Sequence, residues 1–145
     1  MTAPVPIILL LLAACGFANA LYLTLIYYRV IDPASNAIPA FCRLGKQTCQ
    51  AVVFTRYGQV FLIPNSVVAL PFYGLLIWVA LSRSVTGHYQ FLPVVLAGSA
   101  ASLVFSAYLV YVLLVRLKAH CALCLIGHTI NLLIAALLVS IRMTG

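Results

Sequence analysis

The sequence predicts an all-α integral membrane protein, a bundle of four transmembrane helices with a cysteine-bearing loop between the first and the second. Its composition is 66% hydrophobic and only 6% charged, which leaves too little polar surface for a soluble domain. Four stretches contain no Asp, Glu, Lys or Arg: residues 1–28, 57–82, 84–115 and 119–141. Each is longer than the roughly 20 residues that a spanning helix needs, so a bilayer is the expected solvent.

The first helix is expected over residues 4–28, although its sequence imitates a processed signal. It contains an A-x-A triplet at residues 18–20 and a lipobox-like LAAC at residues 12–15. Against cleavage, no Lys or Arg precedes the apolar run, and the run continues past the triplet through LYLTLIYY. We therefore predict a first helix that is retained.

Residues 29–59 form the one long polar segment of the sequence. Turn-forming residues mark irregular backbone in its first half: Asp32-Pro33, Asn36, Pro39 and Gly45. The stretch QAVVFTRYG at residues 50–58 is predicted to form a short amphipathic helix on the membrane surface, with a strand as the alternative.

Three further helices are expected over residues 62–81, 92–115 and 121–141. Pro71 lies inside the first of these, where a proline removes one hydrogen bond and bends the axis. The small residues of AGSAAS give the next helix a face for close packing. The connections are short and the sequence has no internal repeat, so we expect one compact domain over residues 1–145.

The net charge of +7 comes from cations that lie between the apolar runs or at their ends. They form no basic stripe, and no nucleic-acid-binding motif accompanies them, which argues against nucleic acid as a partner. Membrane lipid headgroups are the expected neighbours of these charges.

Two cysteines, Cys121 and Cys124, form a C-x-x-C where the last helix begins, and this spacing places both sulfurs on one helical face. Cys121 lies nearer the N-terminus of the helix, where the helix dipole stabilises a thiolate. Three neighbouring side chains add positive charge: His120, Lys118 and Arg116. Cys121 is therefore the better candidate for thiol exchange. The alternative is a pair of unreactive, small apolar residues.

With four spans, the loop after the first helix lies on the same membrane face as this C-x-x-C. The loop carries Cys42 and Cys49, and such a pair can exchange with a soluble thiol protein and then with the fixed pair through a mixed disulfide. The four cysteines could instead bind structural zinc, but the six residues between the loop cysteines exceed the usual spacing of a zinc motif. Cys15 is alone in the first helix and is expected to be a small packing residue.

The sequence resembles the vitamin K epoxide reductase family over nearly its whole length. The matching residues follow the family's order: Cys42 and Cys49, then Thr55, Arg56, Tyr57 and Gly58, then Asn65 and Ser66, then CALC at residues 121–124 and its trailing Ile130-Asn131. A single C-x-x-C is a weak signal, whereas two cysteine pairs with these motifs in register are specific. The members are four-helix membrane thiol oxidoreductases, so the resemblance implies this fold and this activity.

The resemblance also implies a route for electrons to a membrane quinone. By this match, Cys124 engages the quinone and Cys121 exchanges with Cys49 of the loop. Cys42 then completes the loop disulfide and meets the outside partner. The expected acceptor is ubiquinone or menaquinone, with no metal cofactor. Many bacterial members carry a fused thioredoxin-like domain that is missing here, so a separate reduced thioredoxin-fold protein is the expected electron donor.

The quinone is expected beside Cys124. Cys121, Cys124, His128 and Asn131 recur at spacings of three, four and three, and therefore share one face of the last helix. On this face, His128 can donate a hydrogen bond to a quinone carbonyl or deliver a proton as hydroquinone forms.

The family match places Asn65 at the other carbonyl, and Tyr57 and Phe72 are expected in the apolar walls. The alternative is that Asn65 and His128 only hydrogen-bond between helices. His128 stands where vertebrate members carry a quinone-contacting tyrosine, which argues against vitamin K epoxide as the substrate. Reduction of vitamin K quinone or its epoxide is therefore the alternative within the same class. From a different class, the alternatives are a zinc-stapled membrane scaffold and a soft-metal transporter.

Charge and chemistry predict opposite orientations in the membrane. Six cations are expected on the cysteine face and two on the other: Arg29, Arg43, Lys46, Arg56, Arg116 and Lys118 against Arg83 and Arg142. The positive-inside rule turns the cation-rich face to the cytoplasm. Disulfide formation belongs outside the cytoplasm, as does the active face in the family's usual arrangement. We expect an external or periplasmic active face, with the cytoplasmic face as the alternative.

Overall fold

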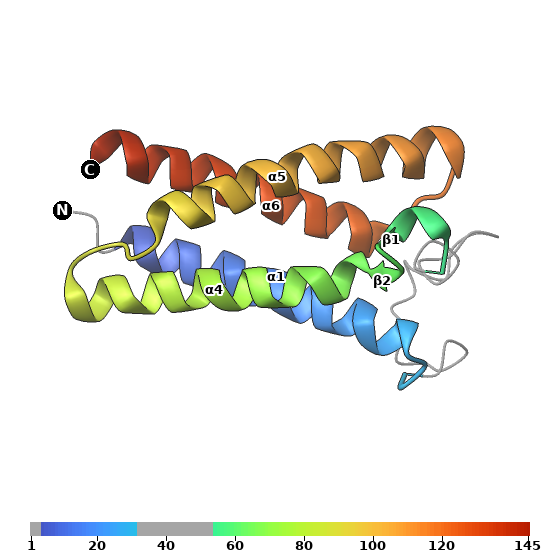
Figure 1. The fold of residues 1–145 in the computed structure, drawn as a ribbon, viewed down its shortest axis with the longest axis horizontal. Helices are drawn as coiled ribbons and strands as arrows, with labels where there is room; N and C mark the ends of the chain where they lie inside the picture. The colour runs from blue at the N-terminus through green and yellow to red at the C-terminus, as the bar shows by residue number, and fades with distance from the viewer. Residues whose placement is uncertain (1–3, 32–53) are drawn as a thin grey trace.

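A computed structural model describes residues 4–31 and 54–145, and these residues form a bundle of four long helices (Figure 1). In chain order they are α1 (Pro4–Tyr27), α4 (Asn65–Thr86), α5 (Leu92–Tyr111) and α6 (Ala122–Thr144). All four are long and apolar enough to cross a bilayer, α5 being counted together with the turn that follows it. The predicted four-helix membrane bundle is confirmed, and the chain is an integral membrane protein.

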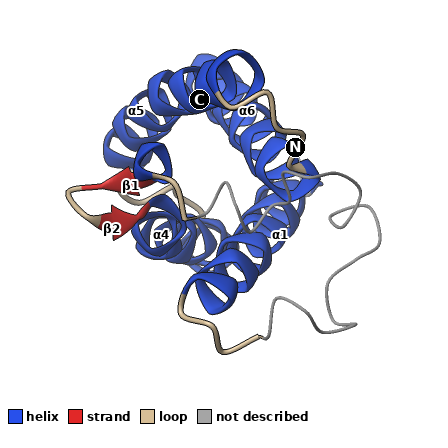
Figure 2. Cartoon of the chain, turned by 90° about the vertical axis from the view of Figure 1, so that its right-hand side faces the viewer, coloured by secondary structure: helices blue, strands red, loops and turns tan. Residues whose placement is uncertain are grey.

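Viewed along the bundle, the helices form a ring in which α1 and α5 each lie between α4 and α6 (Figure 2). Aliphatic side chains from all four helices fill the interior, among them Leu9, Leu76, Val79, Val95, Ile134 and Leu138. Large apolar side chains also cover the outer faces, for example Leu11, Trp78, Val104 and Leu132. Helices that are apolar on every side need either a protein core or a membrane around them.

One end of the bundle gathers the elements that flank the predicted redox centre. The last turn of α1, the segment before α4 and the first turn of α6 lie together there, at the right of Figure 1. The start of α1, the α4–α5 connection and the end of α6 lie at the opposite end. The predicted topology is therefore confirmed for the described elements. Cys42 and Cys49 lie outside the described residues.

The expected surface helix over residues 50–58 is not found in its described part, from Phe54 onward. This part contains only the 3-10 turn η1 (Arg56–Gly58). Aromatic contacts hold it against α1, because Phe54 stacks on Tyr27 with 5.6 Å between ring centroids. Gln59 Nε2 also donates a hydrogen bond to Tyr27 Oη at 3.4 Å. The segment is thus shaped by contacts with α1 rather than by its own periodicity.

A small hairpin replaces the expected first turn of the second helix. β1 (Gln59–Val60) pairs antiparallel with β2 (Ile63–Pro64). Phe61 and Leu62 form the turn with φ values of 50° and 70°, the left-handed region that tight hairpin turns use. Helix α4 therefore begins at Asn65 and not at residue 62.

The end of the same helix also differs from the prediction, which placed it at residue 81. Helix α4 continues through Arg83 to Thr86, and its C-cap Gly87 has a φ of 77° that stops the helix. Helix α5 passes into the π-helical turn η2 (Val112–Arg116), closed by the bond from Leu117 N to Val112 O at 2.9 Å. A π-turn carries one more residue than an α-turn and is often found at functional sites. Here it leads directly into the C-x-x-C.

Candidate active site

The two cysteines of the C-x-x-C differ in access. Cys121 caps α6, because its Sγ accepts the N–H of Cys124 at 3.3 Å, which satisfies one amide that a helix start leaves unpaired. Cys121 is fully buried in an apolar cluster with Leu113 and Ala119. Cys124 carries a free thiol and is only partly buried. Of the two, Cys124 is therefore the sulfur that a ligand can reach.

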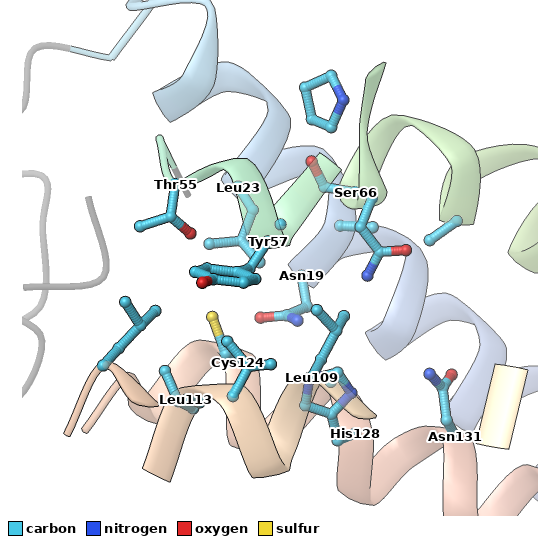
Figure 3. Close-up of a pocket in the computed structure, with 18 of the residues that line it drawn as sticks. Asn19, Leu23, Thr55, Tyr57, Ser66, Leu109, Leu113, Cys124, His128 and Asn131 are labelled. Carbon is cyan, nitrogen blue, oxygen red and sulfur yellow. The ribbon is translucent and has the colours of Figure 1, made fainter. Parts of the chain in front are cut away.

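A cavity of about 110 Å³ lies directly beside Cys124 (Figure 3). All four long helices contribute to its walls, together with η1, Thr55 before it and Pro64 after it. The apolar part of the lining includes Leu23, Leu109 and Leu113. The polar part consists mainly of amides, hydroxyls and an imidazole: Asn19, Thr55, Asn65, Ser66, His128 and Asn131. Such a lining of apolar walls with a few convergent polar groups is typical of small-molecule sites.

Three of the four predicted pocket residues line this cavity together with Cys124. They are Tyr57, Asn65 and His128. Figure 3 shows the ring of Tyr57 over the Cys124 sulfur. These residues come from η1, α4 and α6. The fold thus joins groups that are up to 71 positions apart, from Tyr57 to His128.

Phe72 is not among the residues that line the cavity. Its ring lies against α5, where a Cβ built at Gly98 would come within 2.9 Å of Phe72 Cε2. The α4 residues that line the cavity are instead Ser66 and a row spaced by one helical turn, Asn65, Ala69 and Tyr73. Phe72 falls beside this row and packs between α4 and α5. The next residue in the chain, Tyr73, occupies the wall.

Asn19 of α1 lines the cavity and was not among the predicted site residues. Its Nδ2 donates a hydrogen bond to the carbonyl of Leu123 at 3.2 Å, which ties α1 to the first turn of α6 between the two cysteines. A Cβ at Gly127 would come within 2.9 Å of this Nδ2, so the glycine leaves room for the amide. An amide in an otherwise apolar span is a recognised sign of a functional position. That signal could have identified Asn19.

A chain of hydrogen bonds joins α4, α5 and α6 behind the cavity wall. Tyr73 Oη donates to Asn131 Oδ1 at 2.6 Å, and Asn131 Nδ2 donates to Ser106 Oγ at 3.2 Å. Ser106 Oγ also lies 3.0 Å from His128 Nδ1. Of the four residues predicted to share a face of α6, Cys124, His128 and Asn131 line the cavity, whereas Cys121 does not and is buried with Leu113 and Ala119. The buried Ser106 and Tyr73 were missed by sequence reasoning.

The described residues contain no group of side chains that could form a metal site. Within residues 4–31 and 54–145, no three His, Cys, Asp or Glu side chains gather closely enough to hold a metal ion. The four-cysteine set of a zinc site would include Cys42 and Cys49, which are not described. Cys15 is exposed on α1, which does not agree with the expectation of a small packing residue. It lies on the side of α1 that faces away from the core, unlike Ala13 and Gly16.

Comparison with known proteins agrees with this architecture. No curated protein matches the chain. The model of the Vitamin K epoxide reductase family matches residues 7–139 of the 145, a range that includes every residue named above in the cavity wall. The chain therefore belongs to the vitamin K epoxide reductase family, a family of membrane thiol oxidoreductases and quinone reductases.

Proposed function

We propose that this protein is a quinone-dependent thiol oxidoreductase that generates disulfides. Electrons would pass from a reduced thioredoxin-fold protein to Cys42/Cys49, then to Cys121/Cys124, and finally to ubiquinone or menaquinone. The observation that carries the proposal is the cavity beside Cys124, where an accessible thiol meets apolar walls and hydrogen-bonding side chains. A quinone head group is a flat apolar ring with two carbonyl acceptors, and this lining is complementary to it.

The transfer of electrons and protons from the dithiol to the quinone is balanced. The Cys124 thiolate adds to the quinone ring, and negative charge develops on a carbonyl oxygen. Asn65 and His128, which line the same cavity, would stabilise this charge as hydrogen-bond donors. The Cys121 thiolate then attacks the Cys124 sulfur, forms the disulfide and releases hydroquinone. Both electrons and both protons of the hydroquinone come from the two thiols, so no metal is required.

The loop pair would return the C-x-x-C to its dithiol form. In this step the Cys49 thiolate attacks Cys121 in the new disulfide, and Cys42 resolves the mixed disulfide to form Cys42–Cys49. The thioredoxin-fold partner then reduces the loop disulfide and leaves oxidised. The family match motivates this order, and the segment that follows the loop pair supports it, because Thr55 and Tyr57 line the cavity.

We propose an external or periplasmic active face, because disulfides persist in oxidising compartments. The described cations alone favour the opposite orientation. Arg56 in η1, Arg116 in η2 and Lys118 lie at the C-x-x-C end, whereas Arg83 and Arg142 lie in the last turns of α4 and α6. The proposed orientation follows the chemistry of the two cysteine pairs, which requires an oxidising compartment.

Quinone reduction by the purified protein tests the proposal. Protein in lipid nanodiscs would receive a reduced thioredoxin-fold donor and either a short-chain ubiquinone or a menaquinone analogue, with hydroquinone formation followed by absorbance. We expect turnover by the wild type and none by Cys124→Ala. Cys15→Ala is the matched control and should stay within about twofold of wild type, since this thiol has no exchange partner in the scheme.

Two outcomes would contradict the proposal. A folded wild-type protein that reduces neither quinone would rule out the acceptor class. One bound metal ion per chain, together with no quinone reduction, would favour the zinc-stapled scaffold.

A further inference from the structure

Ser106 lies where α4, α5 and α6 exchange hydrogen bonds behind the cavity. It is 6% exposed, and its Oγ has two polar neighbours, Asn131 Nδ2 at 3.2 Å and His128 Nδ1 at 3.0 Å. Among the described residues, no third group bonds to this hydroxyl. The direction of these two bonds decides which nitrogen of His128 carries a proton.

The single hydroxyl proton of Ser106 has one available acceptor. The Asn131 amide nitrogen is a donor and occupies a lone pair of Ser106 Oγ. The Ser106 O–H must therefore donate to His128 Nδ1, because a buried hydroxyl proton without an acceptor is costly. An Nδ1 that accepts this bond carries no proton. The proton of the neutral imidazole then resides on Nε2.

Tyr73 decides which way the Asn131 amide faces. In the observed orientation the Tyr73 O–H donates to Asn131 Oδ1 at 2.6 Å. If the amide were turned over, its NH₂ would face Tyr73, and the tyrosine proton would lose the only acceptor it has in the described part of the chain. Tyr73 is 3% exposed, so turning the amide over would leave this buried hydroxyl without a protein acceptor. The observed orientation is the one in which the hydroxyl protons of both Tyr73 and Ser106 have an acceptor.

We propose that Ser106 is a positioning residue that fixes His128 as its Nε2–H tautomer and so presents an N–H donor to a quinone carbonyl in the cavity. Ser106, Asn131 and Tyr73 act on the ligand through His128, which lines the cavity itself. The role in turnover rests on the quinone reaction proposed above, whereas the tautomer follows from the hydrogen bonds alone.

The hydrogen-bond chain from Tyr73 through Asn131 and Ser106 does not conduct protons to His128. The Asn131 amide stands between Tyr73 and Ser106. An amide N–H is too weak an acid to pass its proton on near neutral pH. His128 is therefore not supplied with a new proton from behind after it gives one away. Its contribution is a hydrogen bond that strengthens as charge develops on the quinone oxygen. The protons of hydroquinone come from the thiols.

Nitrogen NMR of the imidazoles tests the tautomer directly. The protein has three histidines, so ¹⁵N-histidine labelling gives a simple spectrum. The imidazole signals that disappear in His128→Phe are those of His128. At about pH 8, above the ordinary His pKa of about 6.5, we expect the His128 proton on Nε2 in the wild type. Ser106→Ala should give exchange between the two tautomers. Asn131→Leu is the second variant and should keep the proton on Nε2, because it removes only a donor to Ser106 Oγ and the Ser106 O–H still has Nδ1 as its one acceptor.

Ser99→Ala is the matched control. Ser99 lies on the same helix seven residues before Ser106 and is similarly buried, but its hydroxyl has no hydrogen-bond partner among the described residues. The change should leave the His128 spectrum and the turnover at wild-type values. Ser106→Ala should instead lower kcat by roughly tenfold or more with KM little changed.

The two readouts separate the two claims. A proton on Nδ1 in the wild type would overturn the tautomer assignment, whatever the activity. The expected tautomer in a wild-type protein that reduces no quinone would overturn the role in turnover and the proposed function with it. If the His128 ring exchanges between its two tautomers in Ser106→Ala but kcat is unchanged, the positioning role alone would be overturned.

Discussion

The ring of Tyr73 on α4 lies directly against the backbone of Gly16 on α1, so closely that a Cβ at Gly16 would overlap the ring. Tyr73 is almost fully buried, and its hydroxyl begins the hydrogen-bond chain that ends at His128. Helix α1 thus contributes to the site by leaving space. The fit of one helix against another decides where a tyrosine hydroxyl can be.

Gly16→Ala should destabilise the protein and lower its turnover. The added methyl must displace the Tyr73 ring, and overpacking of this kind costs about 1–3 kcal/mol. Gly74→Ala on α4 is the control, because nothing lies within 4 Å of a Cβ at that position, and a helical Gly→Ala change there should stabilise by roughly 0.5–1 kcal/mol. Thermal unfolding of both variants measures the difference. Equal unfolding temperatures would contradict the close packing.

Asn65→Ala and His128→Phe should lower kcat by roughly ten- to a thousandfold while the protein stays folded. Both residues line the cavity beside Cys124, and a donor that acts in the transition state is felt mainly in kcat. Quinone reduction and thermal unfolding of the same preparations measure the two effects. Variants that unfold at a lower temperature but keep near-normal kcat and KM would show that these residues only hold the helices together.

Cys124→Ala should trap a mixed disulfide between Cys121 and Cys49. Without Cys124, the Cys121 thiolate can still attack Cys49 in the oxidised Cys42–Cys49 loop pair and release Cys42 as a thiol, and no second thiol of the C-x-x-C is left to resolve the mixed disulfide. Peptide mapping under non-reducing conditions should recover the linked pair, and reduction should remove it. The double variant Cys124→Ala/Cys49→Ala is the control and should lose the link. A link from Cys121 to Cys42 would reverse the order of the loop cysteines.

A membrane-impermeant thiol reagent should label Cys42 or Cys49 in intact cells after mild reduction. This expectation follows from the external active face that disulfide chemistry favours. Cys15 should resist the reagent, because it is exposed toward the lipid in the middle of α1. Labelling of the loop cysteines only after permeabilisation would place the active face in the cytoplasm, in agreement with the cation distribution.

The sequence predicts the four spans well because absence of charge over about 20 residues is a direct requirement of the bilayer. Local periodicity did not predict the hairpin before α4. Pro64 in IPNS fits the first turn of a helix, and it also fits the end of an edge strand, which is where the structure places it. The choice between the two depends on contacts with α1, such as the stacking of Phe54 on Tyr27.

The site residues that the sequence predicts lie in motifs or share one helix face. Cys124, His128 and Asn131 follow from helical spacing, and Asn65 and Tyr57 from the family match; the structure places all five around one cavity. Which face of α4 meets the cavity is a matter of register between helices, and so Phe72 was predicted in place of its neighbour Tyr73. Asn19 and Ser106 come from helices that carry no motif, and their roles depend on partners 104 and 22 positions away.

The hydrogen-bond chain from Tyr73 to His128 also has a consequence for biogenesis. Each of the four helices is apolar enough to enter the bilayer separately, and helices in a membrane associate only after insertion. The hydrogen-bond chain forms only when α4, α5 and α6 lie side by side. The Tyr73 ring must also pack against Gly16 of α1. A nascent chain therefore carries its reactive C-x-x-C before it has a pocket, and the oxidant-binding surface matures last, when the final helix docks.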